Sequence, residues 1–200
     1  MEQKKKTEIT KQKILDAAEA EFSELGLAAA RVDSIARSAA VNKQLIYAHF
    51  GSKEGLYSAV LSRVYRRLSE HQNTIAKKEF EGVETVREIV IEYFETLLGD
   101  PAFVRLMLWE NLNGAKYVQS LDVDLYESLR RILKEGMERG MIRRDLDLEQ
   151  TVLSMNMFCF SAFSNVHTLS RIFGKDLGAE DELRKRAEHI SDVLIKYIFG

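Results

Sequence analysis

Residues 31–57, RVDSIARSAAVNKQLIYAHFGSKEGLY, decide how this chain folds. The stretch reads as two short helices joined by Ala-Ala-Val-Asn, and a new helix start follows them. Ile35 supplies the apolar face of the first helix, while Ile46 and Phe50, four residues apart, share the inward face of the second. Asn42 suits the N-cap, because its side-chain oxygen can accept a backbone N–H that the first turn leaves unpaired. This arrangement predicts a helix-turn-helix motif that reads DNA.

The second short helix leaves four hydrogen-bonding side chains outside, those of Lys43, Gln44, Tyr47 and His49. Base edges in the major groove present a readable pattern of donors and acceptors, in which Gln suits adenine and Lys suits guanine. Tyr, His and Lys also bind phosphates. The alternative is that Lys43 and Gln44 form a solvated helix face and that Tyr47 packs on its neighbour. The surrounding motif favours contact with DNA.

Several short elements stand in order between Ile14 and about Val60. They are Ile14-Leu15-Asp16-Ala17-Ala18, Phe22, Gly26, Val32, Ile35-Ala36, Ala40-Val41-Asn42, Ile46-Tyr47-Ala48-His49-Phe50 and Ser52-Lys53-Glu54-Gly55-Leu56. In this order and spacing they resemble the DNA-binding region of the tetracycline-repressor (TetR) family of bacterial transcriptional regulators. The rest of the chain resembles that family only in its helical character and length.

The resemblance implies a three-helix DNA-binding domain followed by a helical regulatory domain. We therefore expect an N-terminal arm and helix-turn-helix domain over residues 1–55, and a ligand-binding and dimerisation domain over residues 56–200. Lys53 matches a lysine that holds a phosphate in the family, beside the free N–H groups of a helix start. The residues expected at DNA are Arg31, Asn42, Lys43, Gln44, Tyr47, His49 and Lys53.

The chain departs from the family pattern in two places, before Val32 and around the joint. Thr or Ser often precedes Val32 and caps the helix, whereas this chain has Ala30 and Arg31 there. Arg31 can hold a phosphate or point into solvent. In the joint, glycine is common where this chain has Ala40, and glycine or threonine is common where it has Gln44 and Leu45.

The distribution of charge also indicates that the N-terminal third of the chain binds DNA. The whole chain of 200 residues has a formal net charge of −2. Residues 1–67 hold 12 Lys or Arg against 8 Asp or Glu, a net of +4, and residues 68–200 hold 17 against 23, a net of −6. The basic excess coincides with the motif, so attraction to phosphates is expected to be local.

The chain shows no sign of secretion or membrane insertion. Residues 1–13 are polar and lack the apolar centre of a signal peptide. The longest apolar stretch, residues 152–169, is interrupted by polar residues, so we interpret it as a buried interface helix and not as a membrane span. These residues include Ser154, Asn156, Ser161, Ser164, Asn165 and His167. Cys159 is the only cysteine and is expected to be a small core residue. We expect a cytoplasmic protein.

The periodicity of apolar residues predicts an all-α fold of about nine helices. Residues 1–9 show no such periodicity, so we expect a flexible basic arm there. The expected helices are 10–25, the two motif helices, one from Ser52 toward Ile75, one from Gly82 to Gly99, one over 101–113, one over 122–139, and two over 147–173 and 181–199. The helix over 101–113 is apolar on most sides, which predicts burial all round. Gly26 is predicted to end the first helix.

Aromatic and methionine side chains after residue 90 suggest a ligand cavity, although each alone is more often a core residue. The family resemblance implies that some of them line a cavity. The candidates are Tyr93, Phe94, Phe103, Met107, Trp109, Glu110, Asn113, Met155 and Phe158. Such a cavity suits a small hydrophobic or aromatic effector.

We expect a ligand-inducible homodimeric repressor that binds a near-palindromic operator in double-stranded DNA. The last two helices should form the dimer interface, with Phe158, Leu183, Ile190 and Leu194 as contributors. One alternative is an effector-independent DNA-binding protein or an activator of the same fold. Another is a helical enzyme or a protein-interaction module. The sequence shows no catalytic or metal-ligand motif, so neither an enzyme, a metal nor a cofactor is expected.

Overall fold

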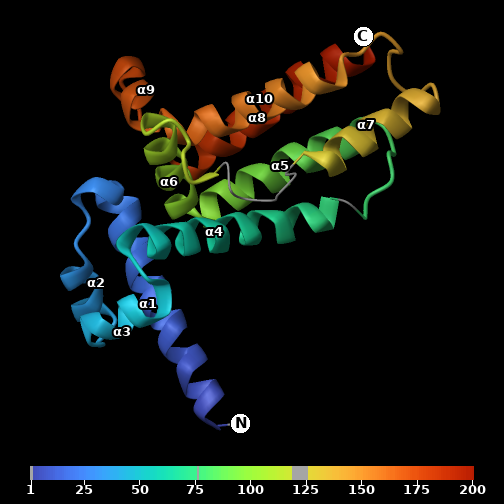
Figure 1. Cartoon of the computed structure of the whole chain (residues 1–200). Helices are drawn as coiled ribbons and strands as arrows, with labels where there is room; N and C mark the ends of the chain where they lie inside the picture. The colour runs from blue at the N-terminus through green and yellow to red at the C-terminus, as the bar shows by residue number, and fades with distance from the viewer. Residues whose placement is uncertain (1, 76, 119–125) are drawn as a thin grey trace. The chain divides into compact units, whose positions relative to one another are not determined.

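The computed structural model describes residues 2–75, 77–118 and 126–200, which form ten α-helices and no strand (Figure 1). The helices are α1 (Glu2–Ala29), α2 (Val32–Ser38), α3 (Lys43–Phe50), α4 (Lys53–Ile75), α5 (Val83–Gly99), α6 (Pro101–Leu112), α7 (Glu127–Glu138), α8 (Leu148–Ser164), α9 (Val166–Phe173) and α10 (Glu180–Phe199). The predicted all-α fold is confirmed.

The chain forms two compact units. The head unit comprises residues 1–67 and 102–122, and the body unit comprises residues 68–101 and 123–200. The functional division expected at residues 55 and 56 remains a prediction.

Apolar side chains from α1 to α4 fill the centre of the head unit. Along α1, Ile14, Ala18 and Phe22 recur every four residues, which places them on one face of the helix, and each is fully buried. Ile35 of α2 and Ile46 of α3 are also fully buried. The helix-turn-helix is therefore supported from behind by the first helix.

Helix α1 differs from its prediction at one end and agrees at the other. It begins at Glu2, so the expected aperiodic arm over residues 1–9 is wrong. The Glu, Gln and Lys residues there favour helix, although they bear no apolar stripe. At Gly26 the backbone leaves the helix, with φ +68° and ψ 172°, as the predicted stop requires.

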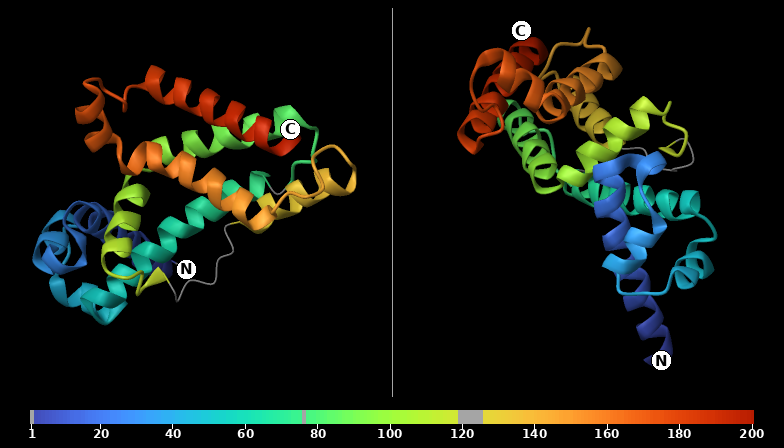
Figure 2. Two further views of the ribbon diagram at one scale, coloured as in Figure 1. Left: turned by 90° about the horizontal axis from the view of Figure 1, so that it is seen from above. Right: turned by 90° about the vertical axis from the view of Figure 1, so that its left-hand side faces the viewer.

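Helices α5, α7, α8 and α10 make up most of the body unit. Helix α10 packs against α5 and α8, and α8 also packs against α5 and α7 (Figures 1 and 2). Leu183, Ile190 and Leu194 of α10 are at most 6% exposed and belong to this core. Their predicted place in a dimer interface is therefore wrong, because the chain buries them against its own helices.

The expected helix over 147–173 is two helices, α8 and α9. The break falls at Asn165, whose φ of −110° and ψ of 8° are not helical and whose side-chain amide donates to Ser164 Oγ at 3.0 Å. Ser and Asn residues have low helix propensity, which favours a break at this point. This break brings the number of helices to ten. The start expected at residue 122 for α7 lies outside the described residues.

Helix α6 is not buried all round as predicted, because Leu108 is 36% and Leu112 is 78% exposed. Among the residues that the structure describes, no helix combines the length and apolar character that crossing a bilayer requires.

Candidate nucleic-acid interface and ligand cavity

Helix α3 presents the side chains that the sequence assigned to DNA. Asn42 caps it as predicted, since its side-chain oxygen accepts the N–H of Gln44 at 2.9 Å. Gln44 is exposed and Tyr47 is 40% exposed, whereas Ile46 is fully buried. His49 is half-buried, with its ring 6.1 Å from that of Phe50. The polar face of α3 is thus open while its apolar face holds the helix in place.

Lys43 forms an ion pair across the motif. Its Nζ donates to Asp33 Oδ2 of α2 at 2.9 Å, and this hydrogen bond raises the pKa of Lys43. Both side chains are solvent-exposed, so the pair is weak and a phosphate can replace the carboxylate. Asp33 was not among the predicted site residues. The spacing of the two helices does not show which lysine its carboxylate would meet.

The start of α4 lies beside the motif. Ser52 Oγ accepts the N–H of Gly55 at 3.0 Å, so the predicted cap is present. Lys53 Nζ donates to the carbonyl of Ala28 at 3.2 Å. A cation therefore stands beside a helix start, where the helix dipole also favours a phosphate.

The start of α2 is held by a residue of α1. Arg31 occupies the N-cap position with extended backbone and makes no capping hydrogen bond with its own side chain. Instead, Glu21 Oε1 accepts the N–H of Arg31 at 3.1 Å and Glu21 Oε2 accepts the hydroxyl of Ser34 at 2.8 Å. Glu21 was not predicted from the sequence. The lack of a hydroxyl at position 31 was the only sign that another residue would hold the start of α2.

The nine candidate ligand residues fall in both units. Phe103, Met107, Trp109, Glu110 and Asn113 lie in the head unit, and Tyr93, Phe94, Met155 and Phe158 lie in the body unit. The structure therefore does not gather them in one described cavity.

The head-unit candidates contact their own unit. Phe103 packs edge-on against Tyr65, whose hydroxyl donates to Met107 Sδ at 2.7 Å. Trp109 Nε1 donates to the carbonyl of Ser23 at 3.2 Å, and Asn113 is exposed.

Glu110 is 2% exposed and fully engaged. Its Oε1 accepts the hydroxyl of Tyr57 at 3.0 Å, and its Oε2 accepts the N–H groups of Tyr117 and Val118 at 3.0 and 3.2 Å. Burial and this hydrogen bond raise the pKa of Tyr57 well above its ordinary value, so the phenol remains a donor. Glu110 therefore serves the packing of the head unit.

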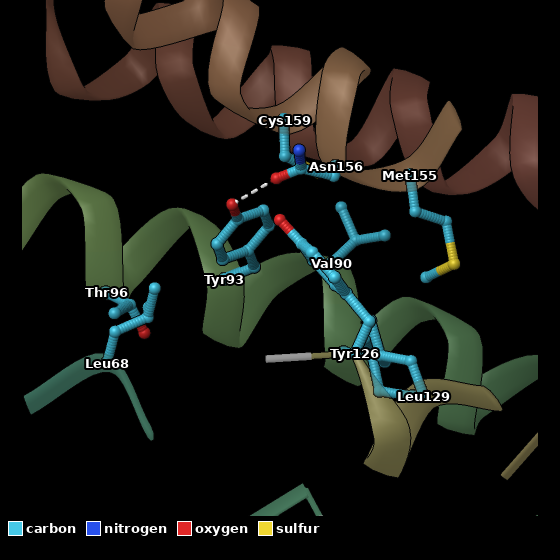
Figure 3. Close-up of a pocket in the computed structure, with 10 residues that line it drawn as sticks. Leu68, Val90, Tyr93, Thr96, Tyr126, Leu129, Met155, Asn156 and Cys159 are labelled. Atoms are coloured by element: carbon cyan, nitrogen blue, oxygen red, sulfur yellow. Dashed lines mark hydrogen bonds between the residues drawn. The ribbon is translucent and has the colours of Figure 1, made fainter. Parts of the chain in front are cut away.

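The body unit contains a small, largely enclosed cavity of about 30 Å³ (Figure 3). Tyr93 of α5 and Asn156 of α8 meet across it, with the hydroxyl donating to Asn156 Oδ1 at 2.6 Å (Figure 3). Burial raises the pKa of Cys159 to about 12, so its thiol is neutral. The lining residues are Leu68, Ile89, Val90, Tyr93, Thr96, Tyr126, Leu129, Met155, Asn156 and Cys159, none of which carries a charge at neutral pH.

Two of the nine candidates, Tyr93 and Met155, line this cavity. Phe94 instead packs edge-on against Phe163, with ring centroids 5.2 Å apart, and Phe158 is 39% exposed. Most of the lining was missed because aliphatic residues at helical spacing look the same whether they line a cavity or fill a core. Among the described residues, no three His, Cys, Asp or Glu side chains group as metal ligands would.

Family models match both parts of the chain. Residues 14–60 match the model described as bacterial regulatory proteins, tetR family, and residues 83–194 match the tetracyclin repressor-like C-terminal domain. The chain belongs to the TetR family. It is therefore a DNA-binding transcriptional regulator, and the helix-turn-helix of α2 and α3 lies within the first match.

The similarity between this TetR-family chain and its relatives extends over nearly its whole length. It is 28% identical to the HTH-type transcriptional repressor NicS of Pseudomonas putida, over 94% of this chain and 91% of that protein. It is 29% identical to the HTH-type transcriptional repressor SCO4008 of Streptomyces coelicolor, over 92% of this chain and 96% of that protein. In fold it is similar to the putative transcriptional regulator SCO4942 of Streptomyces coelicolor, with a TM-score of 0.74, 22% identity and coverage of 94% and 98%.

Proposed function

We propose that this TetR-family regulator is a homodimeric repressor that releases a near-palindromic operator when a small, neutral and mostly apolar molecule enters the body unit. The observation that carries the DNA-binding part is α3, where exposed Gln44 and Tyr47 flank the fully buried Ile46. Repression is supported by the names of the relatives NicS and SCO4008. Two copies of α3 would enter successive major grooves, which favours an operator with two-fold symmetry.

The residues proposed at DNA have different tasks. Gln44 and Tyr47 face outward from α3 and suit base edges, whereas Lys53 and Arg31 lie at helix starts and suit phosphates. Lys43 would exchange Asp33 for a phosphate or a base on binding. Asn42 contributes through its cap, and His49 lies at the end of α3.

Operator binding tests these assignments. Lys53→Ala should weaken binding to every duplex and reduce the slope of log affinity against log salt by about 0.9, the value of one phosphate contact. Gln44→Ala should lose ~1–3 kcal/mol of discrimination at one base pair. Lys134→Ala, an exposed lysine of α7 in the body unit, is the control and should change neither. Unchanged binding in the first two variants would show that α3 and the α4 start are not the DNA face.

Exposed apolar side chains on the last helices support the dimer. Leu153, Met157 and Phe158 of α8 are 41%, 66% and 39% exposed, and Val193 and Tyr197 of α10 are 41% and 46% exposed. An open groove of about 610 Å³ lies among α8, α9 and α10. Apolar surface of this kind marks contact with another protein, and we assign it to the second subunit.

The cavity lining supports a neutral effector. It offers hydrogen-bonding groups from Tyr93, Asn156, Thr96 and Tyr126 within an otherwise apolar wall. Glu110 cannot attract a cationic ligand there, because its carboxylate is buried in the head unit and engaged by three donors. At about 30 Å³ the cavity is smaller than a drug-sized site of roughly 300–1,000 Å³, so the ligand must displace side chains as it enters.

Chain continuity offers a route from this cavity to the DNA-binding motif. Helix α5 lines the cavity and is joined by Asp100 alone to α6, which in turn contacts α1 and α4 within the head unit. Helix α4 also begins next to the motif and reaches the cavity lining with Leu68. A ligand that favours one arrangement of α5 would thereby favour one arrangement of the two DNA-binding motifs.

A screen of neutral aromatic and alicyclic compounds tests the effector. Compounds that raise the melting temperature should also release the labelled operator, and Asn156→Leu should weaken both effects together, since it removes the partner of Tyr93. Glu110→Gln is the control and should leave the ligand response intact. Release by a compound whose effect is unaltered in Asn156→Leu and Met155→Ala would place the ligand site elsewhere.

One measurement distinguishes each alternative from the proposed repressor. An activator would bind the same operator but raise transcription, and an effector-independent regulator would bind DNA and answer no compound. A non-enzymatic role is supported by the relatives, which are named as transcriptional regulators. We place this activity in the cytoplasm, where a bacterial operator is found.

A further inference from the structure

The N-cap residue of α2 has no side chain that can cap the helix. The N-cap residue is Arg31, which has no hydroxyl or short carbonyl side chain to accept a backbone N–H. The helix therefore begins without the side chain that ordinarily stabilises its first turn.

Glu21 supplies a different acceptor for the start of α2, from another helix. Its two oxygens accept the Arg31 N–H at 3.1 Å and the Ser34 hydroxyl at 2.8 Å. Ser34 is the third residue of α2, the position at which a capping-box glutamate would reach back to the N-cap N–H. Glu21 performs that glutamate's task from α1, and its negative charge is favourable near a helix N-terminus.

The same arrangement leaves the Arg31 side chain available. Arg31 is exposed and forms no ion pair within the described part of the chain. A guanidinium at this position binds phosphate through several donors, which a capping threonine could not do.

We propose that Glu21 is a positioning residue for DNA binding: its carboxylate caps α2 from α1 and allows position 31 to carry a phosphate-binding arginine. The second half rests on the proposed function, because it requires the motif of α2 and α3 to meet DNA. The first half does not, because it concerns the stability of α2 in the free protein.

A four-member set of full-length proteins separates the two halves: wild type, Glu21→Ala, Arg31→Thr and the double variant. Hydrogen exchange of the α2 amides should be about fivefold to tenfold faster in Glu21→Ala, since losing a cap costs ~1 kcal/mol. Arg31→Thr adds a hydroxyl that can accept the N–H of Ser34, a second way to cap the first turn, so the double variant should recover most of the wild-type protection. Glu24→Ala is the matched control, because it removes a carboxylate of α1 that pairs with Arg105 and should leave α2 unchanged.

Duplex binding gives the second readout. Glu21→Ala should bind operator about fivefold more weakly with the wild-type salt slope, since Arg31 is still present. Both proteins with Thr at position 31 should lose about 0.9 from that slope, the value of one phosphate contact. Glu21→Gln, which keeps one acceptor oxygen, should fall between wild type and Glu21→Ala in both exchange and affinity.

Three outcomes would overturn the proposal. Unchanged α2 exchange in Glu21→Ala would show that the carboxylate is not a cap. Failure of Arg31→Thr to slow exchange in the double variant would show that Glu21 does not act by capping the first turn. An unchanged salt slope in Arg31→Thr would remove the arginine from the DNA contact. If the wild-type protein binds no duplex, the proposed function fails, while the exchange measurements still decide the cap.

Discussion

The indole ring of Trp109 lies against the backbone of Gly26, so closely that a Cβ placed on the glycine would be 2.7 Å from Trp109 Cδ2. The same indole donates to the carbonyl of Ser23, three residues earlier in α1. Gly26 also has a φ of +68°, a conformation that residues with a Cβ rarely adopt. One residue without a side chain therefore ends the helical run of α1 and seats α6 of the head unit against it.

Gly26→Ala should destabilise the protein through both effects. The backbone penalty can be isolated with Gly114→Ala, because Gly114 has a similar φ of +74° but nothing within 4 Å of its Cβ position. We expect Gly26→Ala to cost about 2 kcal/mol more than Gly114→Ala in urea unfolding, the scale of an overpacked site. The emission of Trp109, the only tryptophan, should shift to the red in Gly26→Ala alone. Equal losses in the two variants would show that the indole yields without cost.

Ala40 is a second site where backbone conformation decides stability. It has a φ of +54°, in the joint of the helix-turn-helix. The left-handed region costs a residue with a Cβ about 1–2 kcal/mol, which exceeds the entropy that a glycine loses on folding, about 0.5–1 kcal/mol. Ala40→Gly should therefore raise the melting temperature slightly. Ala39→Gly, at a φ of −77°, should lower it, and a lower melting temperature in both variants would contradict this account.

Local signals explain why the motif was predictable from the sequence. The Asn42 cap and the Ser52 cap each join groups within three residues of one another. The same holds for the helix stops at Gly26 and Gly99. Short-range chemistry of this kind is written in the spacing of the residues.

Contacts between distant segments explain what was missed. Glu21 and Ser34 are 13 residues apart, and Tyr57 and Glu110 are 53 apart, so no spacing rule pairs them. Trp109 and Glu110 were assigned to a ligand because aromatic and polar residues on an apolar helix carry no mark of the partner they meet. The α8–α9 break at Asn165 was not predicted, because α8 continues through other polar residues of the same stretch, such as Ser154 and Asn156.

Glu110 should matter for the stability of the head unit. Glu110→Ala leaves the Tyr57 hydroxyl and the N–H groups of Tyr117 and Val118 without their acceptor, and an unsatisfied buried group costs about 1–3 kcal/mol. We expect a loss of about 3 kcal/mol in urea unfolding. Tyr57→Phe removes one donor and keeps the carboxylate bonded to the backbone, so it should cost about 1 kcal/mol. A loss in Glu110→Ala no larger than that in Tyr57→Phe would show that the two backbone contacts contribute nothing.

The assignment of the dimer surface predicts which substitutions separate the subunits. Met157→Glu and Tyr197→Glu place a charge on exposed positions of α8 and α10, 66% and 46% accessible in one chain. Sedimentation at micromolar concentration should show folded monomers, and operator binding should fall sharply, since one subunit covers only a half-site. Leu112→Glu, a change at a 78% exposed leucine of α6, is the control and should remain dimeric. Leu194→Glu should instead unfold the body unit, because Leu194 is 1% exposed in the core of the chain itself. A wild-type protein that sediments as a monomer, or dimers in both surface variants, would remove the second subunit from α8 and α10.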